Sequence, residues 1–151
     1  MKDKTLSVSA IQEGTVIDHI PANSLFDVIN ILKLDKLKSQ ITFGSNFLSK
    51  QLGRKAIVKI EGKFFSAEEI NRISLVAPQA KLNIIHDYSV TEKHIVEVPD
   101  TIEGIAKCMN PKCITNNENV STKFKVVDKQ NVALKCHYCE KITDRKHLEI
   151  L

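Results

Sequence analysis

The chain has 151 residues, of which 42% are hydrophobic and 26% charged, a composition typical of one large globular domain or two small ones. Its formal net charge of +4 is mild and evenly divided: residues 1–99 carry 13 Lys and Arg against 11 Asp and Glu, and residues 100–151 carry 9 against 7. This even distribution does not indicate the concentrated basic face that many nucleic-acid-binding proteins have. No run of 18 apolar residues occurs, and the charged start precedes no apolar, cleavable segment, so we expect no membrane span, no signal peptide and a cytoplasmic protein.

The beginning of the chain predicts a strand followed by a helix. Apolar and polar residues alternate over residues 4–20 with an interruption at Gly14, which is typical of one bent strand or two short ones. Ser24 and Asp27 have the spacing of a capping box, so we expect a helix to begin there. The apolar residues at helical spacing are Leu25, Val28, Ile29 and Leu32.

Further strand patterns and a second helix follow. Ser66 and Glu69 form another capping-box pattern, and Pro78 is expected to end the helix that begins there. The strand patterns cover residues 40–47, 55–61, 81–86 and 90–98. The order strand–helix–strand–strand–helix–strand predicts an α+β fold, in which two helices cover an antiparallel sheet of the ferredoxin-like type.

The stretch Pro99-Asp100-Thr101 interrupts these patterns and is the expected domain boundary. It divides the chain into an N-terminal domain of residues 1–99 and a C-terminal domain of residues 100–151. The second domain has short β patterns, which predict a small all-β domain. A domain of this size buries little apolar surface, so we expect it to need an additional cross-link.

All four cysteines lie in this second domain, with the spacing Cys108-x4-Cys113-x22-Cys136-x2-Cys139. In a reducing compartment, paired cysteines indicate metal or redox chemistry more often than disulfides. Two close pairs separated by a hairpin predict four thiolate ligands around one structural zinc ion, with backbone amides of the short second loop pointing toward the sulfurs. Iron in the same site is one alternative. A redox dithiol at the second pair is another, although it leaves the first pair unexplained.

The residues by themselves do not indicate an enzyme. None of the five histidines belongs to a His-Glu-x-x-His motif, and no nucleophile-elbow, Walker or dinucleotide motif occurs. Asp18 and His19 are adjacent, but neighbours in a strand point to opposite faces, so we expect no shared catalytic role. Two hypotheses remain at this point, a nucleic-acid-binding zinc ribbon and a regulatory or adaptor subunit. Only Phe124 and Tyr138 are aromatic in the second domain, which weakens the first hypothesis.

Several segments together resemble a known family. The first is Gly14-Thr-Val-Ile-Asp-His-Ile-Pro-Ala22, which resembles the N-terminal motif of the regulatory chain of aspartate carbamoyltransferase. The same family is matched, in order, by Gly53-Arg-Lys, Lys59-Ile-Glu61, Ala77-Pro-Gln-Ala80 and Ala133-Leu-Lys-Cys-x-Tyr-Cys-Glu140. The resemblance covers residues 6–140 and implies a non-catalytic subunit. Its N-terminal domain would bind nucleotides, and its zinc domain would hold the catalytic chain.

The resemblance also implies partners and effectors. In this family, regulatory dimers bridge catalytic trimers, CTP inhibits, ATP activates, and UTP assists inhibition in some members, which controls pyrimidine biosynthesis. The matching triphosphate positions are His19, Lys55 and Lys93, the ribose positions are Asp18 and Lys59, and the base positions are Val8, Ala10, Ile11 and Tyr88.

Two further residues match positions that face the catalytic chain, Asn110 in the first cysteine loop and Glu140 after the last cysteine. The chain departs from the family pattern at Ser9 and Lys112, and its last ten residues match poorly. These departures leave the order of effectors and the details of the subunit contact open.

Overall fold

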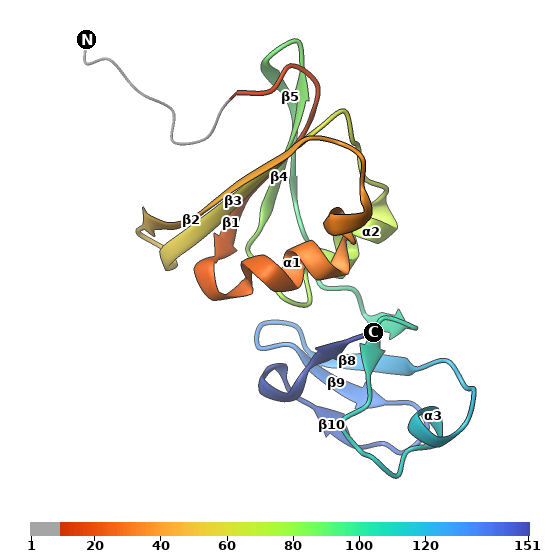
Figure 1. Ribbon diagram of the computed structural model, residues 1–151. Coiled ribbons are helices and arrows are strands. Elements are labelled where there is room, and N and C mark those ends of the chain that lie inside the picture. Colours follow the sequence, from red (N-terminus) through yellow and green to blue (C-terminus); the bar gives the residue numbers. More distant parts are fainter. Residues whose placement is uncertain (1–9) are drawn as a thin grey trace. The chain divides into compact units, whose positions relative to one another are not determined.

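The structure is a computed structural model that describes residues 10–151. The chain divides into two compact units between Val96 and Glu97 (Figure 1). We call them the N-terminal unit and the C-terminal unit. None of the helices within the described residues is long and apolar enough to cross a membrane.

The N-terminal unit contains a five-stranded antiparallel sheet of order β2-β3-β1-β4-β5. The strands are β1 (Gly14–Pro21), β2 (Ile41–Ser49), β3 (Gly53–Glu61), β4 (Lys81–His86) and β5 (Ser89–Ile95). The helices are α1 (Leu25–Ile31) and α2 (Ala67–Ile73), with short 3-10 turns η1 (Ala22–Ser24) and η2 (Leu34–Lys36). Because α1 joins β1 to β2 and α2 joins β3 to β4, this is the ferredoxin-like arrangement, with β5 added beside β4. The predicted fold class is confirmed.

The two faces of this sheet differ in chemistry. On the inner face, Val58, Ile17 and Leu82 lie side by side on β3, β1 and β4 and are completely buried. Figure 1 shows α1 and α2 on one side of the sheet. The residues that alternate with the buried row define the outer face. These are Val16, Asp18, Lys55, Lys59, Lys81, Asn83 and Lys93.

The two predicted capping boxes have different outcomes. At α2 the box is confirmed, because the Glu69 N–H donates to Ser66 Oγ and the Ser66 N–H donates to Glu69 Oε1. At α1 the prediction is wrong: Ser24 makes no side-chain capping bond. Ser24 ends a 3-10 turn with φ −104° and ψ 1°, so its backbone lacks the extended conformation that aligns a capping hydroxyl.

Helix α2 ends at Ile73, five residues before the predicted stop at Pro78. The Ser74 hydroxyl donates to the Asn71 carbonyl oxygen, and the Leu75 N–H donates to the Arg72 oxygen. Both hydrogen bonds join a residue to the carbonyl oxygen three positions earlier, as in a 3-10 helix. They tighten the last turn and replace the four-residue spacing of α-helical hydrogen bonds.

The C-terminal unit combines a four-stranded antiparallel sheet of order β10-β9-β8-β6 with the pair β11-β7. The strands are β6 (Thr101–Glu103), β7 (Ala106–Lys107), β8 (Lys123–Asp128), β9 (Ala133–Cys136), β10 (Ile142–Thr143) and β11 (Glu149–Ile150). A four-residue helix α3 (Ile114–Asn117) and a 3-10 turn η3 (Arg145–His147) interrupt the β pattern. Apart from the cysteines, its buried apolar residues are Val98, Ile102, Ala106, Phe124, Val126, Val132 and Leu134, which make a small core for an independent domain.

Gly14 starts β1 where two backbones approach closely. Its φ is +142°, and a Cβ atom at this position would lie 2.1 Å from the carbonyl oxygen of Ile60. Gly62 provides a comparison, because it has φ +69° but no atom within 4 Å of such a Cβ. A side chain at Gly14 therefore meets both backbone strain and a steric clash, whereas one at Gly62 meets backbone strain alone.

We predict that Gly14→Ala lowers the free energy of unfolding by roughly 2–4 kcal/mol, from strain and overpacking together. Gly62→Ala should cost about 1 kcal/mol, because only the left-handed backbone is penalised. Denaturant titration followed by circular dichroism measures both values. Equal losses for the two variants would contradict the proposed clash with Ile60.

Candidate metal centre and charged sheet face

The four cysteine sulfurs of the C-terminal unit gather around one point. All four lie within 4.8 Å of one another. The Sγ atoms of Cys108 and Cys139 are 3.6 Å apart, and those of Cys113 and Cys136 are 3.7 Å apart. A tetrahedral zinc site with Zn–S bonds of ~2.3 Å has sulfur–sulfur distances of about 3.8 Å, whereas a disulfide bond is about 2.05 Å long. The free thiols therefore have the spacing of a metal site.

The first cysteine loop is held by side-chain amides. The Asn116 amide donates to the carbonyl oxygens of Cys108 at 2.9 Å and Asn110 at 2.8 Å. The Cys113 N–H donates to the Asn110 oxygen at 3.0 Å, and Cys113 then begins α3. Sequence reasoning missed Asn116. The polar run that begins at Thr115 is the available signal, because such side chains favour bonds to nearby backbone.

The second cysteine loop forms a tight turn at the end of β9. The Glu140 N–H donates to the Cys136 carbonyl oxygen at 3.0 Å, and the left-handed φ of +63° at Glu140 closes the turn. The backbone N–H groups of Cys139 and Tyr138 donate to the Cys136 sulfur. The predicted orientation of amides toward this sulfur is confirmed.

Burial and neighbouring groups change the pKa of three thiols of the cluster. Burial raises the pKa of the Cys108 thiol to about 12, and burial also raises the pKa of Cys136. At Cys139, burial acts in the same direction, but the Lys141 N–H, the Asn110 side chain and two neighbouring sulfurs together lower the pKa to about 7. Four thiolates so close together repel one another, so a bound cation is needed to deprotonate the whole set. A divalent ion with a preference for tetrahedral sulfur fits this requirement, and zinc is such an ion.

Asp18 is the centre of a charge cluster on the outer face of the N-terminal sheet. Its Oδ1 lies 3.0 Å from Lys55 Nζ and accepts the His19 N–H at 2.6 Å. The register of β1 against β3 shifts between Ile17 and Ile20, and His19 has φ +60°. This bulge turns the His19 ring toward Asp18, so the expectation that the two side chains point to opposite faces is wrong.

The His19 ring has an unused polar atom. Its Nδ1 is buried and has no hydrogen-bond partner among the described residues. Asp18 Oδ2 lies 3.6 Å away, which is an ion-pair distance but too long for a hydrogen bond. A buried polar atom without a partner is costly, so it indicates a place where another group can bind.

Lys59 and Lys93 lie on the same outer face. Both belong to one cross-strand row, in which Lys59, Val16, Asn83 and Lys93 follow one another over β3, β1, β4 and β5. Burial lowers the pKa of the Lys59 ammonium group. Sequence reasoning missed Lys81 and Asn83, which share this face. The alternation of these polar residues with buried Leu82 and Ile84 is a signal for them.

Tyr88 lies in the tight turn between β4 and β5. Asp87 and Tyr88 have φ values of +50° and +64°, as in a two-residue type I′ hairpin. The Tyr88 N–H donates to the Gln12 carbonyl oxygen at 3.1 Å. The Glu13 carboxylate accepts the Asp87 N–H at 3.1 Å and lies 2.7 Å from His86 Nδ1. The hairpin tip is therefore fixed against the segment that precedes β1.

The remaining predicted positions are distributed as follows. Ala10 is exposed and Ile11 is buried, both directly before the segment that contacts Tyr88. Val8 lies outside the described residues. Asn110 lies in the first cysteine loop, where its Oδ1 accepts the Lys112 N–H at 3.1 Å. Glu140 is exposed at the end of the second cysteine loop.

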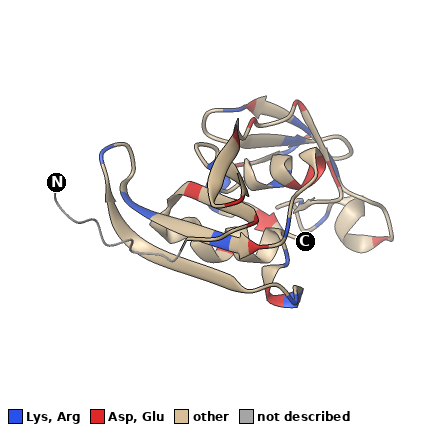
Figure 2. Cartoon of the chain, turned by 90° about the horizontal axis from the view of Figure 1, so that it is seen from above, with Lys and Arg blue, Asp and Glu red and all other residues tan. Residues whose placement is uncertain are grey.

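Charges of both signs are interspersed along the chain. Figure 2 shows Lys and Arg in blue and Asp and Glu in red, with both colours spread over the ribbon. Overall charge therefore does not mark a surface for nucleic acid, and the informative charges are the local clusters described above.

Comparisons with known proteins match the two units separately. A family model described as "Aspartate carbamoyltransferase regulatory chain, allosteric domain" matches residues 6–97. A second model, described as "Aspartate carbamoyltransferase regulatory chain, metal binding domain", matches residues 100–149. The two matches contain the charged sheet face and the cysteine cluster, respectively.

Curated relatives match over nearly their whole length. The aspartate carbamoyltransferase regulatory chain of Bacteroides thetaiotaomicron is 56% identical over 148 residues, which cover 98% of this chain and 97% of the relative. That of Pyrococcus abyssi is 56% identical over 145 residues, 95% of each chain. That of Porphyromonas gingivalis is 50% identical over 151 residues, 100% of each chain. With an allosteric domain, a metal-binding domain and these relatives, the chain belongs to the aspartate carbamoyltransferase regulatory chain family.

Proposed function

We propose that this chain is the non-catalytic regulatory subunit of a cytoplasmic aspartate carbamoyltransferase holoenzyme. In this proposal, residues 1–99 bind CTP and ATP, with UTP as a further effector. Residues 100–151 bind one structural zinc ion and contact the catalytic chain. The subunit thereby transmits allosteric control of pyrimidine biosynthesis. The alternative, a nucleic-acid-binding zinc ribbon, is not favoured by the family match.

The outer face of the N-terminal sheet supports the nucleotide site. Lys55, Lys59 and Lys93 supply positive charge on one face, and Asp18 lies among them. The hairpin tip with Tyr88 lies at the Gly14 end of β1. Asp18 is four residues further along this strand, which places it about 13 Å from Gly14 at a rise of about 3.3 Å per residue. A nucleoside triphosphate is an extended polyanion with a planar base at one end, so it suits a face of this length and charge.

Each group has a chemical role in this proposal. The lysine ammonium groups act as compact charges for the triphosphate, and the His19 ring, which lies beside Asp18, is a further polar group there. The Asp18 carboxylate accepts hydrogen bonds that the ribose hydroxyls donate. Backbone groups of residues 10–12, beside Tyr88, are available for the edge of the base. Opposite effects of CTP and ATP require that each favours a different quaternary state, by couplings of about 1–3 kcal/mol.

The cysteine cluster supports the role of the C-terminal unit. Four sulfurs occupy all positions of a tetrahedral metal, so none is left for a substrate, and the ion is structural. Such sites contribute roughly 10–16 kcal/mol of binding free energy in small zinc domains. The metal thereby joins the two loops that carry Asn110 and Glu140, the positions proposed to contact the catalytic chain.

The edge strand β2 supports a regulatory-chain homodimer. Its nine residues carry no charged side chain, and β2 has β3 as its single partner strand among the described residues. Leu48 is 78% exposed and Phe43 is 49% exposed, and Phe43 contacts the exposed ring of Phe26. A long, uncharged, apolar edge favours pairing with another strand. We propose that a second copy of this chain pairs there.

Cys113→Ser should abolish binding of the one zinc ion per chain, because a hydroxyl is a poor replacement for a thiolate. The variant should also fail to retain the catalytic trimer, because the contact loops lose their common anchor. Elemental analysis measures zinc, and co-purification measures assembly. His137→Ala, within the second cysteine loop, should keep its zinc. If a zinc-free variant assembled normally with the catalytic trimer, the proposal that the metal supports this interface would be contradicted.

Lys93→Ala should weaken binding of both CTP and ATP by about 10-fold to 100-fold, since a hydrogen bond to a charged group contributes about 1.5–3 kcal/mol. Both nucleotides should be affected, because they share the triphosphate. Isothermal titration calorimetry measures the two dissociation constants. Lys36→Ala makes the same charge change in η2 and should leave them unchanged. Unaltered affinity of Lys93→Ala for both nucleotides would exclude Lys93 from the site.

Leu48→Lys should weaken the homodimer by more than tenfold, because it removes apolar contact worth about 1.5–3 kcal/mol and places a charge on each side of the proposed strand pair. Sedimentation over a range of concentrations measures the dissociation constant. Ile95→Lys is the matched control, as it changes an exposed residue of the opposite edge strand β5. If Ile95→Lys dissociates the dimer and Leu48→Lys does not, the dimer edge is β5.

A further inference from the structure

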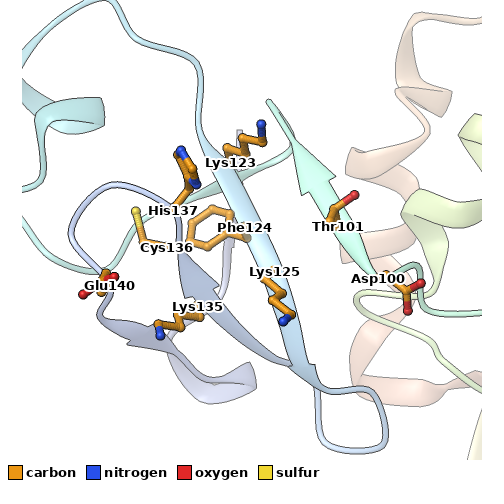
Figure 3. A pocket seen from close by; sticks show the side chains of 9 residues that line it. All are labelled: Asp100, Thr101, Lys123, Phe124, Lys125, Lys135, Cys136, His137 and Glu140. Atoms are coloured by element: carbon orange, nitrogen blue, oxygen red, sulfur yellow. The ribbon is translucent and has the colours of Figure 1, made fainter.

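The sheet of the C-terminal unit contains a cavity of about 380 Å³ to which no role has yet been assigned. Figure 3 shows its lining side chains, which come from β6, β8, β9 and the second cysteine loop. The residues that matter here are Thr101, Lys123, Phe124, Lys125, Lys135 and His137. Cys136 also lines the cavity, but its sulfur belongs to the metal cluster.

Two lysines of this cavity oppose each other directly. Lys125 on β8 and Lys135 on β9 are partners in the antiparallel register, and both are exposed. Like charges at directly opposite positions destabilise a sheet. Neither ammonium group has a carboxylate within 4.0 Å among the described residues. The pair is therefore a local excess of positive charge that the fold itself does not neutralise.

The nearby acidic groups already have other partners. Asp100 Oδ1 lies 2.6 Å from Lys129 Nζ, and Glu103 Oε1 lies 3.7 Å from Lys123 Nζ. The hydrogen bond and charge of Lys129 lower the pKa of Asp100, with a smaller contribution from Lys125. Among the lining residues this leaves Glu140, at the loop end of the cavity, and within the described residues it forms no ion pair with Lys125 or Lys135.

The shape and chemistry of the cavity indicate the kind of group it accepts. Figure 3 shows the Phe124 ring beside Cys136, between the Lys123 and Lys125 side chains. Phe124 and Cys136 are buried, whereas Lys123, Lys125 and Lys135 are exposed, so the accessible lining consists mainly of lysine side chains with apolar methylene stems and charged ends. Such a lining suits a carboxylate on a short apolar stem, which is the chemistry of a Glu or Asp side chain. A small inorganic anion would use the charged ends alone.

We propose that an acidic side chain of the catalytic chain inserts into this cavity and neutralises Lys125 and Lys135. The inference rests on the proposed function, and it extends the contact from Glu140 across the face formed by β8 and β9. Lys135 lines the cavity together with His137 and Glu140 of the second cysteine loop, so the cavity and this loop share one surface. Charge complementarity of this kind makes assembly sensitive to salt.

Lys135→Glu in the full zinc-loaded chain tests the proposal. The dissociation constant for the catalytic trimer should rise at least tenfold at low salt, and its dependence on salt should become weaker. Lys135→Gln, which only neutralises the charge, should have a smaller effect in the same direction. Lys146→Glu makes the same charge reversal on the exposed turn η3, outside the cavity, and should bind as the unaltered chain does. Zinc content must be unchanged in all three variants.

The outcomes separate this inference from the proposed function. If the unaltered chain does not bind a catalytic trimer, the proposed function fails. If the unaltered chain and Lys146→Glu bind, and Lys135→Glu and Lys135→Gln bind with the same affinity and salt dependence, only the cavity proposal is overturned. Calorimetry with inorganic phosphate tests the alternative that the cavity binds a free anion. Saturable phosphate binding that Lys135→Glu removes, together with unchanged assembly, would assign the cavity to a free anion and also overturn the proposal.

Discussion

The mutual repulsion of four closely spaced thiolates is the constraint on which the C-terminal unit depends. Burial raises the pKa of Cys108 to about 12, so without a cation this thiol keeps its proton, and with a divalent ion the four sulfurs become ligands. The strands of this unit are short, and its apolar core is small. The metal therefore joins segments that apolar burial alone would hold weakly. Asn116 and the left-handed Glu140 shape the loops, and the ion unites them.

The N-terminal unit follows a different principle, because its sheet has one buried apolar face and one charged face. Buried Ile17, Val58 and Leu82 pack on the side of the helices, so the opposite face is free to carry charge. The bulge at His19 breaks the regular alternation and brings the His19 ring to Asp18, where Lys55 also lies. A local irregularity thus concentrates functional groups without disturbing the core, which is a common use of bulges.

The two units differ in how they present charge. On the N-terminal sheet, lysines surround a carboxylate and an imidazole, a combination suited to a polyanion with hydroxyl groups. On the C-terminal sheet, Lys125 and Lys135 oppose each other across β8 and β9 over an apolar cavity, which suits a side-chain carboxylate. A chain with a net charge of only +4 achieves both by local placement. The strand register, which decides which charged side chains are neighbours, therefore matters more for these local clusters than the total charge does.

The sequence by itself determined the element order, the ferredoxin-like fold class, the family and the cysteine cluster, because periodicity, motifs and close cysteine pairs are local signals. It also predicted the Ser66 and Glu69 capping box, since both partners lie within one turn. It did not predict the failure of the Ser24 box, the contact of His19 with Asp18, or the opposition of Lys125 to Lys135. Those features depend on a preceding 3-10 turn, a bulge and the pairing of distant strands. Only the tertiary structure decides these, because register sets which side chains share a face.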